Sequence, residues 1–166
     1  VASLIEKDLK DLTVFVLDKP RHRGLVEEIH QAGARVTLYP AGDVAGAIMA
    51  AIPDTEVDVL MGTGGTPEGI ISACAIRAMG GEFQGRINPQ LATEIVSVRN
   101  AGFDTERWYE RDELIGSDDV HFCATGITSG LLFRGVKLTK HHFKTETLIV
   151  TGASKEQVSL TNWHNR

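Results

Sequence analysis

The sequence predicts an α/β fold with a mixed, partly parallel sheet flanked by helices. In the N-terminal half, short apolar, β-branched runs alternate with segments of helical periodicity. This alternation is typical of βαβ units, in which the strands run parallel. The C-terminal part reads instead as successive strands joined by short turns, which favours antiparallel neighbours. At 166 residues the chain suits one domain or part of a larger one.

The first segments in chain order are a helix, a strand and a second helix. Residues 1–12 contain apolar residues at helical spacing, which are Leu4, Ile5, Leu9 and Leu12. Thr13–Leu17 is a short apolar, β-branched run and is expected to be a buried strand. Pro20 suits the first turn of a helix that ends near Gly33, because glycine is favoured just past a helix end.

The alternation continues to the middle of the chain. Ala34–Tyr39 alternates between apolar and polar residues and predicts a strand, and residues 42–52 predict a helix of small residues. Val57–Met61 predicts a third strand. A glycine-rich loop then leads into a helix over Pro67–Met79, and a further helix is expected over Pro89–Asn100.

The C-terminal part has a different character. Residues 107–115 are polar and are expected to be irregular or helical. Four strand-like segments follow, and we expect them to extend the same sheet with antiparallel strands. The four segments are Asp119–Ile127, Leu131–Thr139, Thr145–Gly152 and Glu156–Asn162. Residues 124–130, from the end of the first segment to the start of the second, predict either a turn near a functional site or a plain hairpin.

Composition excludes several classes of function. A net charge of −5 argues against a general affinity for nucleic acid. The longest apolar run, residues 44–52, is too short to span a membrane. No secretory signal opens the chain, so we expect a cytoplasmic protein with no nucleic-acid or membrane partner. Cys74 and Cys123 are expected to be buried free thiols rather than a disulfide, and they form no zinc-binding pattern.

Polar residues follow the first predicted strand, at the end where ligands bind in open α/β sheets. Lys19 and Arg21 stand on either side of Pro20. Arginine offers a planar fork and lysine a point charge, and both suit phosphate. Cations at a helix N-terminus interact unfavourably with the positive end of the helix dipole. A bound anion would offset this repulsion. A solvent-exposed helix start is the alternative. His22 either helps to bind the anion or, as the pattern favours, is a neutral residue of the helix start.

Two further strand ends carry candidate site residues. Asp43, after the second strand, suits either a cap for its helix, which the local pattern favours, or a contact with a sugar hydroxyl. After the third strand, Gly62, Gly64 and Gly65 let the backbone approach an anion closely. Glu68 either stabilises its helix N-terminus or binds a divalent cation that bridges to phosphate, with other ligands from elsewhere. No GK[ST] follows, which argues against a P-loop.

Several motifs together resemble one enzyme family. They are LDKPRH after the first strand, GARV and GDVAGAI around the second, and MGTGGTPEGIISACAIRAMGG after the third, followed by DDVHFCATGITSGLL. In order and spacing they resemble the class II fructose-1,6-bisphosphatases, the GlpX-type sugar bisphosphatases. The resemblance implies a layered sugar-phosphatase fold, Mn²⁺ or Mg²⁺ as cofactor, and hydrolysis of the 1-phosphate of fructose 1,6-bisphosphate. Cyanobacterial-type members also accept sedoheptulose 1,7-bisphosphate.

The resemblance also implies roles for individual residues. Glu68 is implied as a divalent-metal ligand, and no catalytic residue is assigned within the chain. Ala41 departs from the family pattern, which often has an acid there, so this contact is lost or is made by the backbone. The implied substrate-binding residues are Lys19, Pro20, Arg21, Ala41, Gly42, Asp43 and Gly65.

The resemblance covers only part of the family's length. Members are about twice as long, and their N-terminal half carries most of the metal carboxylates in a DPxDGT-like segment that this sequence lacks. The chain also opens with Val1, within a predicted helix. Residues 1–166 are therefore expected to be the C-terminal domain of a homo-oligomeric sugar bisphosphatase, inactive or weakly active without the N-terminal half. The alternatives are a sugar-phosphate-binding module without catalysis and a structural fragment whose exposed sheet edge needs a partner.

Overall fold

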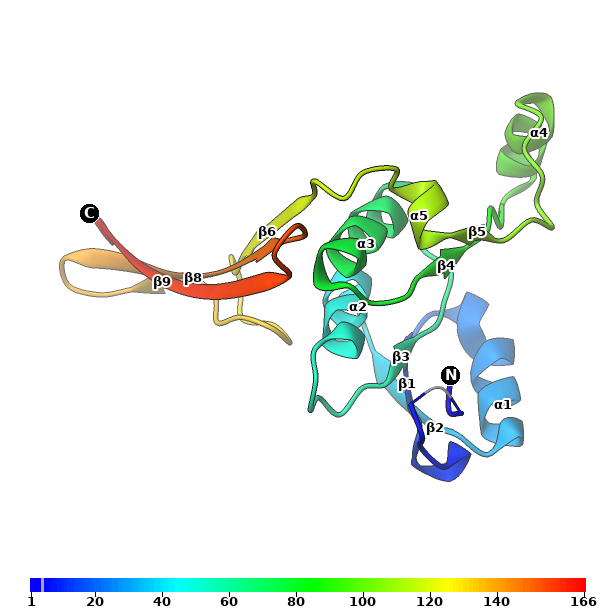
Figure 1. Ribbon diagram of the computed structural model, residues 1–166, viewed down its shortest axis with the longest axis horizontal. Coiled ribbons are helices and arrows are strands. Elements are labelled where there is room, and N and C mark those ends of the chain that lie inside the picture. The colour runs from blue at the N-terminus through cyan, green and yellow to red at the C-terminus, as the bar shows by residue number, and fades with distance from the viewer. Residues whose placement is uncertain (4) are drawn as a thin grey trace.

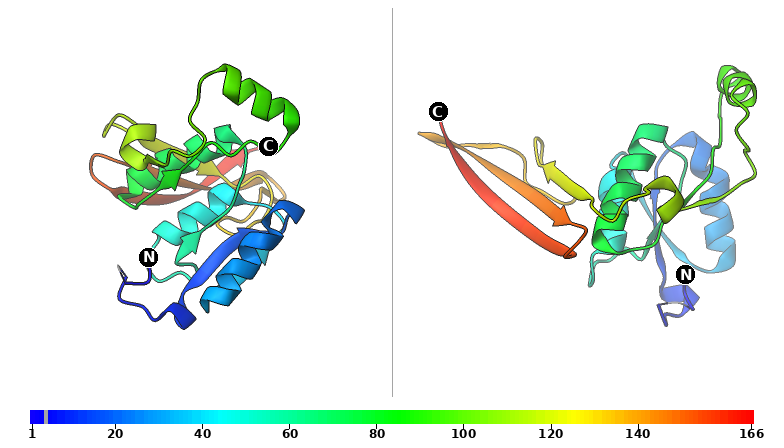
Figure 2. Two further views of the ribbon diagram at one scale, coloured as in Figure 1. Left: turned by 90° about the vertical axis from the view of Figure 1, so that its right-hand side faces the viewer. Right: turned by 45° about the horizontal axis from the view of Figure 1, so that its top comes forward.

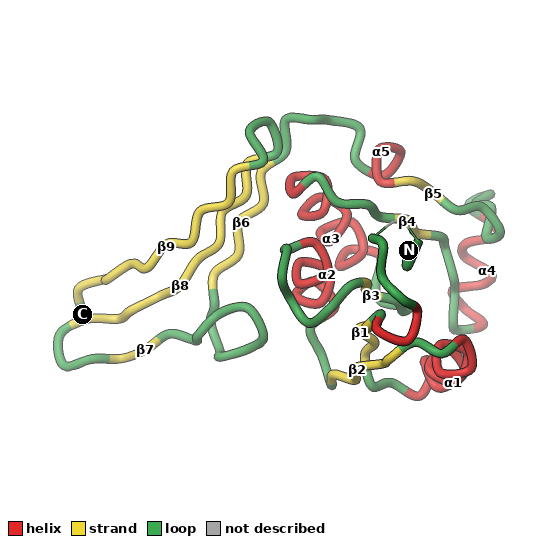
Figure 3. The backbone as a smooth tube through the Cα atoms, turned by 60° about the horizontal axis from the view of Figure 1, so that its bottom comes forward, coloured by secondary structure: helices red, strands yellow, loops and turns green. Residues whose placement is uncertain are grey.

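The computed structural model describes residues 1–3 and 5–166 and arranges them in layers (Figure 1). Helix α1 (Arg23–Ala32) covers one face of a three-stranded parallel sheet, and α2 (Asp43–Ala51) covers the other. Helix α3 (Thr66–Met79) packs beside α2. A four-stranded antiparallel sheet lies against the far side of α2 and α3 (Figure 3). The chain is thus an α/β protein with parallel and antiparallel sheets flanked by helices, as the sequence predicted.

The parallel sheet has the strand order β2-β1-β3. These strands are β1 (Thr13–Leu17), β2 (Arg35–Tyr39) and β3 (Val59–Leu60). Successive side chains of a strand point to opposite faces. In β1, Val16 packs against α1, whereas Phe15 packs against α2, and both side chains are fully buried. Because helices cover both faces, the central strand is a continuous apolar run rather than an alternating one.

Two glycines set how the helices meet this sheet. A 3₁₀ turn at Pro20–His22 leads into α1, which ends at Gly33 with a φ of 92°. Glycine adopts this left-handed conformation without steric cost. Gly46 of α2 faces β1, and a Cβ atom there would lie 2.6 Å from a ring carbon of Phe15. Only glycine therefore lets α2 approach the sheet this closely.

The four C-terminal strands form a sheet of their own, so the prediction that they extend the parallel sheet is wrong. Both α2 and α3 are rich in small apolar residues. The faces that these helices turn away from the parallel sheet are apolar too, so they must pack against other apolar side chains. Ile48 and Ala75 of these helices pack with Phe122 and Val150 of the new sheet. The strands are β6 (His121–Thr125), β7 (Lys137–Leu138), β8 (His142–Thr151) and β9 (Glu156–Asn165).

In this sheet β8 is central, with β6 and β7 on one side and β9 on the other. Strands β8 and β9 pair over their whole length and extend beyond the helices as a two-stranded ribbon (Figure 2). Leu148 and Val150, near the helices, are buried, whereas Trp163 at the far end is 60% exposed. The sheet is therefore anchored at one end only.

A small antiparallel ribbon carries the remaining helices. Its strands are β4 (Gln84–Gly85) and β5 (Tyr109–Glu110), and α5 (Arg111–Leu114) follows directly. Helix α4 (Ala92–Asn100) projects away from the layers (Figure 1), and apolar side chains beside and within it, such as Leu91, are exposed. Across residues 1–3 and 5–166, no helix is long and apolar enough to cross a bilayer.

The N-terminal segment is not the predicted helix. Leu9–Asp11 forms a single 3₁₀ turn, and Leu4 lies outside the described residues. Glu6 has a φ of 52°, and this left-handed conformation interrupts a right-handed helix. Lys7 instead pairs with Asp58 at 2.7 Å, so an ion pair rather than a helical stripe attaches this segment to the sheet.

Both cysteines are free thiols, as predicted, but the expectation that both are buried is wrong. Cys74 is half-buried in α3, and Cys123 is exposed on β6. Cys123 follows Phe122, which packs toward the helices. Because neighbouring residues of a strand face opposite ways, the thiol points to solvent.

Candidate functional site

The loops that follow the three parallel strands lie side by side at the carboxyl edge of the sheet, where α/β proteins bind ligands. Two close approaches show that the loops meet. A Cβ atom on Gly64, after β3, would lie 3.0 Å from Oδ2 of Asp43, after β2. A Cβ atom on Gly62 would lie 3.1 Å from the ring of His22, after β1. The structure therefore brings together all three predicted strand ends.

His22 is buried and joins the first loop to the third. Its Nδ1 lies 2.8 Å from the carbonyl oxygen of Leu17, and its Nε2 lies 2.8 Å from the amide nitrogen of Thr63. Because a carbonyl only accepts, Nδ1 donates to Leu17. Nε2 also lies 3.1 Å from the carbonyl oxygen of Thr63, so the ring contacts both backbone polar groups of that residue. His22 was expected at the helix start, but its bridging role was missed because Thr63 lies 41 residues away in sequence.

Cationic side chains gather on the outer side of the first loop. The Arg21 Nε donates to the carbonyl oxygen of Thr63 at 2.7 Å. Lys19 is half-buried and, with Arg23 and the acid Asp18, lines a cavity of about 140 Å³. Within residues 1–3 and 5–166, none of these three cations forms an ion pair. Their charge is therefore available to an anion.

Asp43 begins α2 with its carboxylate toward the glycine loop. Its Oδ1 accepts the N–H of Val44 at 3.0 Å, whereas Oδ2 faces Gly64. The preceding Gly42 has a φ of 102°, and a Cβ atom there would lie 3.7 Å from a methyl of Leu131. Leu131 belongs to the loop between β6 and β7. Leu131 directly follows residues 124–130, so the residue after that segment lies against the start of α2.

Glu68 lies in the first turn of α3 and folds its carboxylate over Gly65. A Cβ atom on Gly65 would lie 2.1 Å from Oε2 of Glu68, so any side chain there would displace the carboxylate. The φ of Gly65 is −68°, which every residue adopts, and the atoms in the way belong to the exposed, flexible end of Glu68, so neither conformation nor space strictly requires glycine here. Glu68 is exposed and forms no ion pair among the described residues. Asn88 also holds the loop, because its Nδ2 donates to Oγ1 of Thr63 at 3.2 Å.

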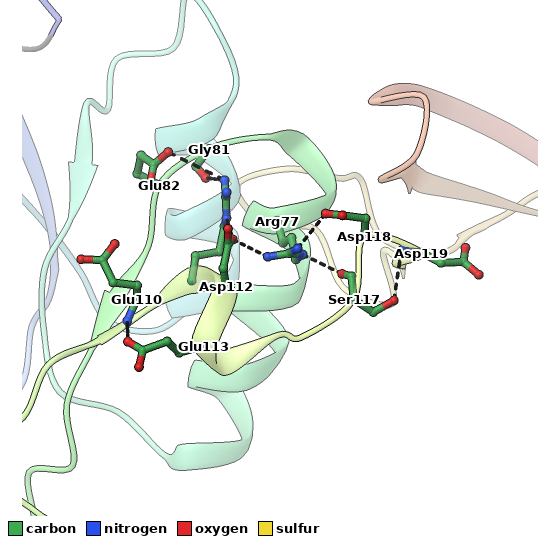
Figure 4. A network of polar contacts seen from close by, with 10 residues as sticks. Arg77, Gly81, Glu82, Glu110, Asp112, Glu113, Ser117, Asp118 and Asp119 are labelled. Atoms are coloured by element: carbon green, nitrogen blue, oxygen red, sulfur yellow. Dashed lines mark hydrogen bonds and ion pairs between the residues drawn. The ribbon is translucent and has the colours of Figure 1, made fainter.

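The acid-rich stretch before β6 forms an ion-pair network with arginines (Figure 4). Arg77 of α3 pairs with Asp112 and, at 2.7 Å, with Asp118, and its Nε donates to the carbonyl oxygen of Ser117 at 2.6 Å. The hydrogen bond from Arg111 holds the pKa of Asp112 below its usual value. These acids tie α3 to α5 and to the segment leading to β6. Within residues 1–3 and 5–166, no group of three or more His, Cys, Asp or Glu residues could hold a metal ion.

The edge thus combines three chemical properties. Cations lie on the β1 side, and the carboxylates of Asp43 and Glu68 lie on the β2 and β3 sides. Between them α3 begins at Thr66, and the first N–H groups of a helix have no carbonyl partner and carry partial positive charge. Such an arrangement suits an anionic group flanked by hydroxyls or by a cation.

Comparison with known proteins identifies relatives of the chain. Residues 1–164 match the family described as bacterial fructose-1,6-bisphosphatase, glpX-encoded. The chain is 40% identical to a "Fructose-1,6-bisphosphatase class 2" of Haemophilus influenzae over 177 aligned positions, 99% of this chain and 53% of the relative. It is 38% identical to a "D-fructose 1,6-bisphosphatase class 2/sedoheptulose 1,7-bisphosphatase" of Synechococcus elongatus, over 93% of this chain and 49% of the relative. The chain spans about half the length of these curated relatives.

Proposed function

The chain belongs to the glpX-encoded bacterial fructose-1,6-bisphosphatase family, and on that premise we propose that it is the substrate-binding half of a sugar bisphosphatase. The reaction is hydrolysis of the 1-phosphate of fructose 1,6-bisphosphate to fructose 6-phosphate and phosphate. Sedoheptulose 1,7-bisphosphate is a second proposed substrate, because one relative's name includes both activities. The observation that carries the proposal is the convergence of cations, glycine loop and carboxylates at one sheet edge.

Lys19 and Arg21 bind a phosphate group of the substrate. Pro20 between them restricts the backbone and keeps the two cations in fixed relation. The Nε of Arg21 is already held by the carbonyl of Thr63, so its two terminal nitrogens are oriented before the substrate arrives. A planar pair of N–H donors matches two phosphate oxygens. These residues position the substrate and take no part in bond cleavage.

The sugar lies against the second and third loops. The Oδ2 of Asp43 faces Gly64 rather than a backbone donor and accepts a sugar hydroxyl. Ala41 and Gly42 contribute backbone contacts, since neither offers a functional group. Gly65, at the start of α3 beneath the Glu68 carboxylate, contacts the substrate through its backbone in this proposal.

Glu68 is proposed as one ligand of a divalent cation. Its exposed carboxylate provides the hard oxygen that Mn²⁺ and Mg²⁺ prefer. Such an ion would neutralise phosphoryl oxygens and lower the pKa of the attacking water. A single carboxylate is an incomplete ligand set, and the described residues hold no cluster of three. The other ligands therefore come from an N-terminal half of the kind that the longer relatives have, with residues 1–166 as the C-terminal domain of a homo-oligomer.

A second candidate function is sugar-phosphate binding without catalysis. The cationic loop and Asp43 favour it, because they could retain fructose 6-phosphate with no metal present. The two functions differ in whether joining the chain to a metal-binding half produces turnover.

The test joins the N-terminal half of the Haemophilus influenzae relative to residues 1–166. With fructose 1,6-bisphosphate and Mn²⁺, we expect phosphate release from the fusion and none from the isolated chain. Glu68→Gln should lower kcat by about 100-fold, and Arg21→Gln should raise KM by about tenfold, the usual size for a lost charge-assisted contact. Arg99→Gln, an exposed cation on α4, is the matched control and should change neither.

Three results would contradict the proposal. Strong turnover by the isolated chain would show that no second half is needed. An active fusion with unchanged kcat in Glu68→Gln would remove the metal role. An inactive fusion whose isolated chain binds fructose 6-phosphate equally with and without Mn²⁺ in calorimetry would favour the binding module.

A further inference from the structure

The far part of the antiparallel sheet is basic although the protein is acidic. The chain has a net charge of −5. Residues 131–146 nevertheless contain a single acid, Glu146, among several cations. Like charges on neighbouring positions repel each other, so stability alone does not favour this concentration. The cations are Arg134, Lys137, Lys140 and Lys144.

Three of these cations surround a cavity of about 460 Å³. The walls come from β7, β8, β9 and the loop before β7. The loop is folded tightly on itself, because a Cβ atom on Gly135 would lie 2.6 Å from the backbone nitrogen of Ser129. A volume of this size falls in the range of small-molecule sites. The charged and aromatic side chains that line it are Arg134, Lys137, Lys144, Glu146 and Trp163.

Glu146 cancels only one of the three positive charges. It accepts the backbone N–H of Arg134 at 3.0 Å, and Lys144 Nζ lies 3.5 Å from its carboxylate. The backbone hydrogen bond from Arg134, followed by the charge of Lys144, holds the pKa of Glu146 below its usual value. Glu146 is therefore fully ionised near neutral pH. The cavity keeps a net charge of about +2, which matches a dianion.

An exposed indole lies beside these charges. Trp163 of β9 pairs directly with Lys144 of β8, and Lys144 Nζ lies 5.9 Å from the ring centroid. His142 packs edge-on against the same ring at 6.2 Å. The indole remains 60% exposed, so its face is accessible to a ligand. A flat apolar surface next to cations that outnumber the acid suits a ligand with one anionic and one apolar part.

We propose that this cavity binds a phosphate monoester of metabolite size. The phosphate would lie among Arg134, Lys137 and Lys144, where an arginine fork and two point charges meet a dianion, with the rest of the molecule against Trp163. The proposal does not rest on the sugar-bisphosphatase function. No residue of the cavity comes from the loops that follow β1, β2 and β3.

Fluorescence of Trp163 tests the proposal directly. The chain has two tryptophans, so Trp108→Phe leaves Trp163 as the only one. This variant is titrated with inorganic phosphate and with fructose 6-phosphate, and sodium chloride at equal ionic strength is the control. We expect a saturable change of emission with both phosphates and only a shallow, unsaturated change with chloride.

Matched variants locate the binding. Lys144→Gln and Lys137→Gln should each weaken phosphate binding by about tenfold, the effect of losing one charge-assisted contact. Lys140→Gln removes a cation of the same segment that does not line the cavity and should leave binding within about twofold. Arg21→Gln should also leave it unchanged, which separates this site from the loop edge. Circular dichroism checks that each variant is folded, and Lys137→Gln replaces Lys144→Gln if the latter is not.

The outcomes decide the proposal either way. A response to phosphate that equals the response to chloride, or an equal loss in Lys140→Gln and Lys144→Gln, would show general charge screening and overturn it. A response that disappears only in Arg21→Gln would assign the anion to the other site and also overturn it.

Discussion

The central strand of the parallel sheet is buried much more completely than any strand of the antiparallel sheet. In the parallel sheet, the side chains of Phe15 and Val16 are completely buried because helices cover both faces. In the antiparallel sheet, β9 has no buried residue, and only the helix-proximal ends of β6 and β8 are covered. The parallel sheet thus holds three loops in fixed relation, whereas the antiparallel sheet is a ribbon attached at one end.

This difference in burial indicates which interactions stabilise each sheet. Burial on both faces makes the parallel sheet depend on packing, so its loops can be positioned by contacts such as that of His22 with Thr63. The ribbon depends on its ladder of backbone hydrogen bonds and on cross-strand pairs. Substitutions should therefore cost much more stability in the first region than in the second.

The largest expected effect comes from the centre of the parallel sheet. Phe15→Ala removes a fully buried ring that packs against α2, and should lower the free energy of unfolding by about 3–5 kcal/mol. Leu160→Ala on β9, where the side chain is 37% exposed, is the matched change in the other sheet and should cost less than about 1 kcal/mol. Urea unfolding of both variants measures the difference. Equal losses would mean that the ribbon is covered to the same extent as the core.

The next largest effect concerns the bridge between loops. His22→Ala leaves the Leu17 carbonyl and the Thr63 amide without their partner, and should cost about 2 kcal/mol. The amide of Thr63 should then exchange with solvent faster, and fructose 6-phosphate should bind more weakly. His121→Ala, at an exposed histidine of β6, is the control. Unchanged exchange at Thr63 in His22→Ala would contradict the role assigned to this ring.

The smallest effect is a pH dependence that differs between the sheets. Burial acts to raise the pKa of Asp58, but the hydrogen bonds from Lys7 and from the backbone of Thr13 outweigh it and hold the pKa below its usual value. A lowered pKa in the folded state stabilises the protein above the unfolded value of about 3.9, and this contribution is lost as pH falls through the folded value. Asp58→Asn should therefore cost about 1 kcal/mol at pH 7, from the lost ion pair and the weakened backbone contact, and much less near pH 3.

Glu146 provides the counterpart in the antiparallel sheet. Its pKa is lowered in the same direction, chiefly by the backbone N–H of Arg134, but its side chain is more exposed than that of Asp58. Glu146→Gln should show the same sign of pH dependence with a smaller amplitude. Thermal unfolding between pH 3 and pH 7 measures both. A larger change of stability with pH in Glu146→Gln than in Asp58→Asn would contradict the prediction that the effect is smaller in the antiparallel sheet.

Local patterns predicted the elements whose periodicity and end signals agree. The buried strand Thr13–Leu17 and the helix end at Gly33 follow from composition and backbone conformation, which neighbouring residues control. The helix predicted for residues 1–12 does not form, although the apolar residues have helical spacing. Glu6 has a left-handed backbone conformation, and Lys7 forms an ion pair with Asp58 instead. The same limit applies to Cys123, whose exposure depends on which face of β6 the helices cover.

The sequence by itself determined the alternation of strands and helices, the three polar strand ends and the resemblance to the family, since each of these lies in residues that are close along the chain. Only the tertiary structure decided that the last strands form a second sheet, that His22 holds the glycine loop and that Arg134, Lys144 and Trp163 line one open cavity. Each of these depends on contacts between distant segments, and such contacts are chosen by the burial of whole faces rather than by local propensity.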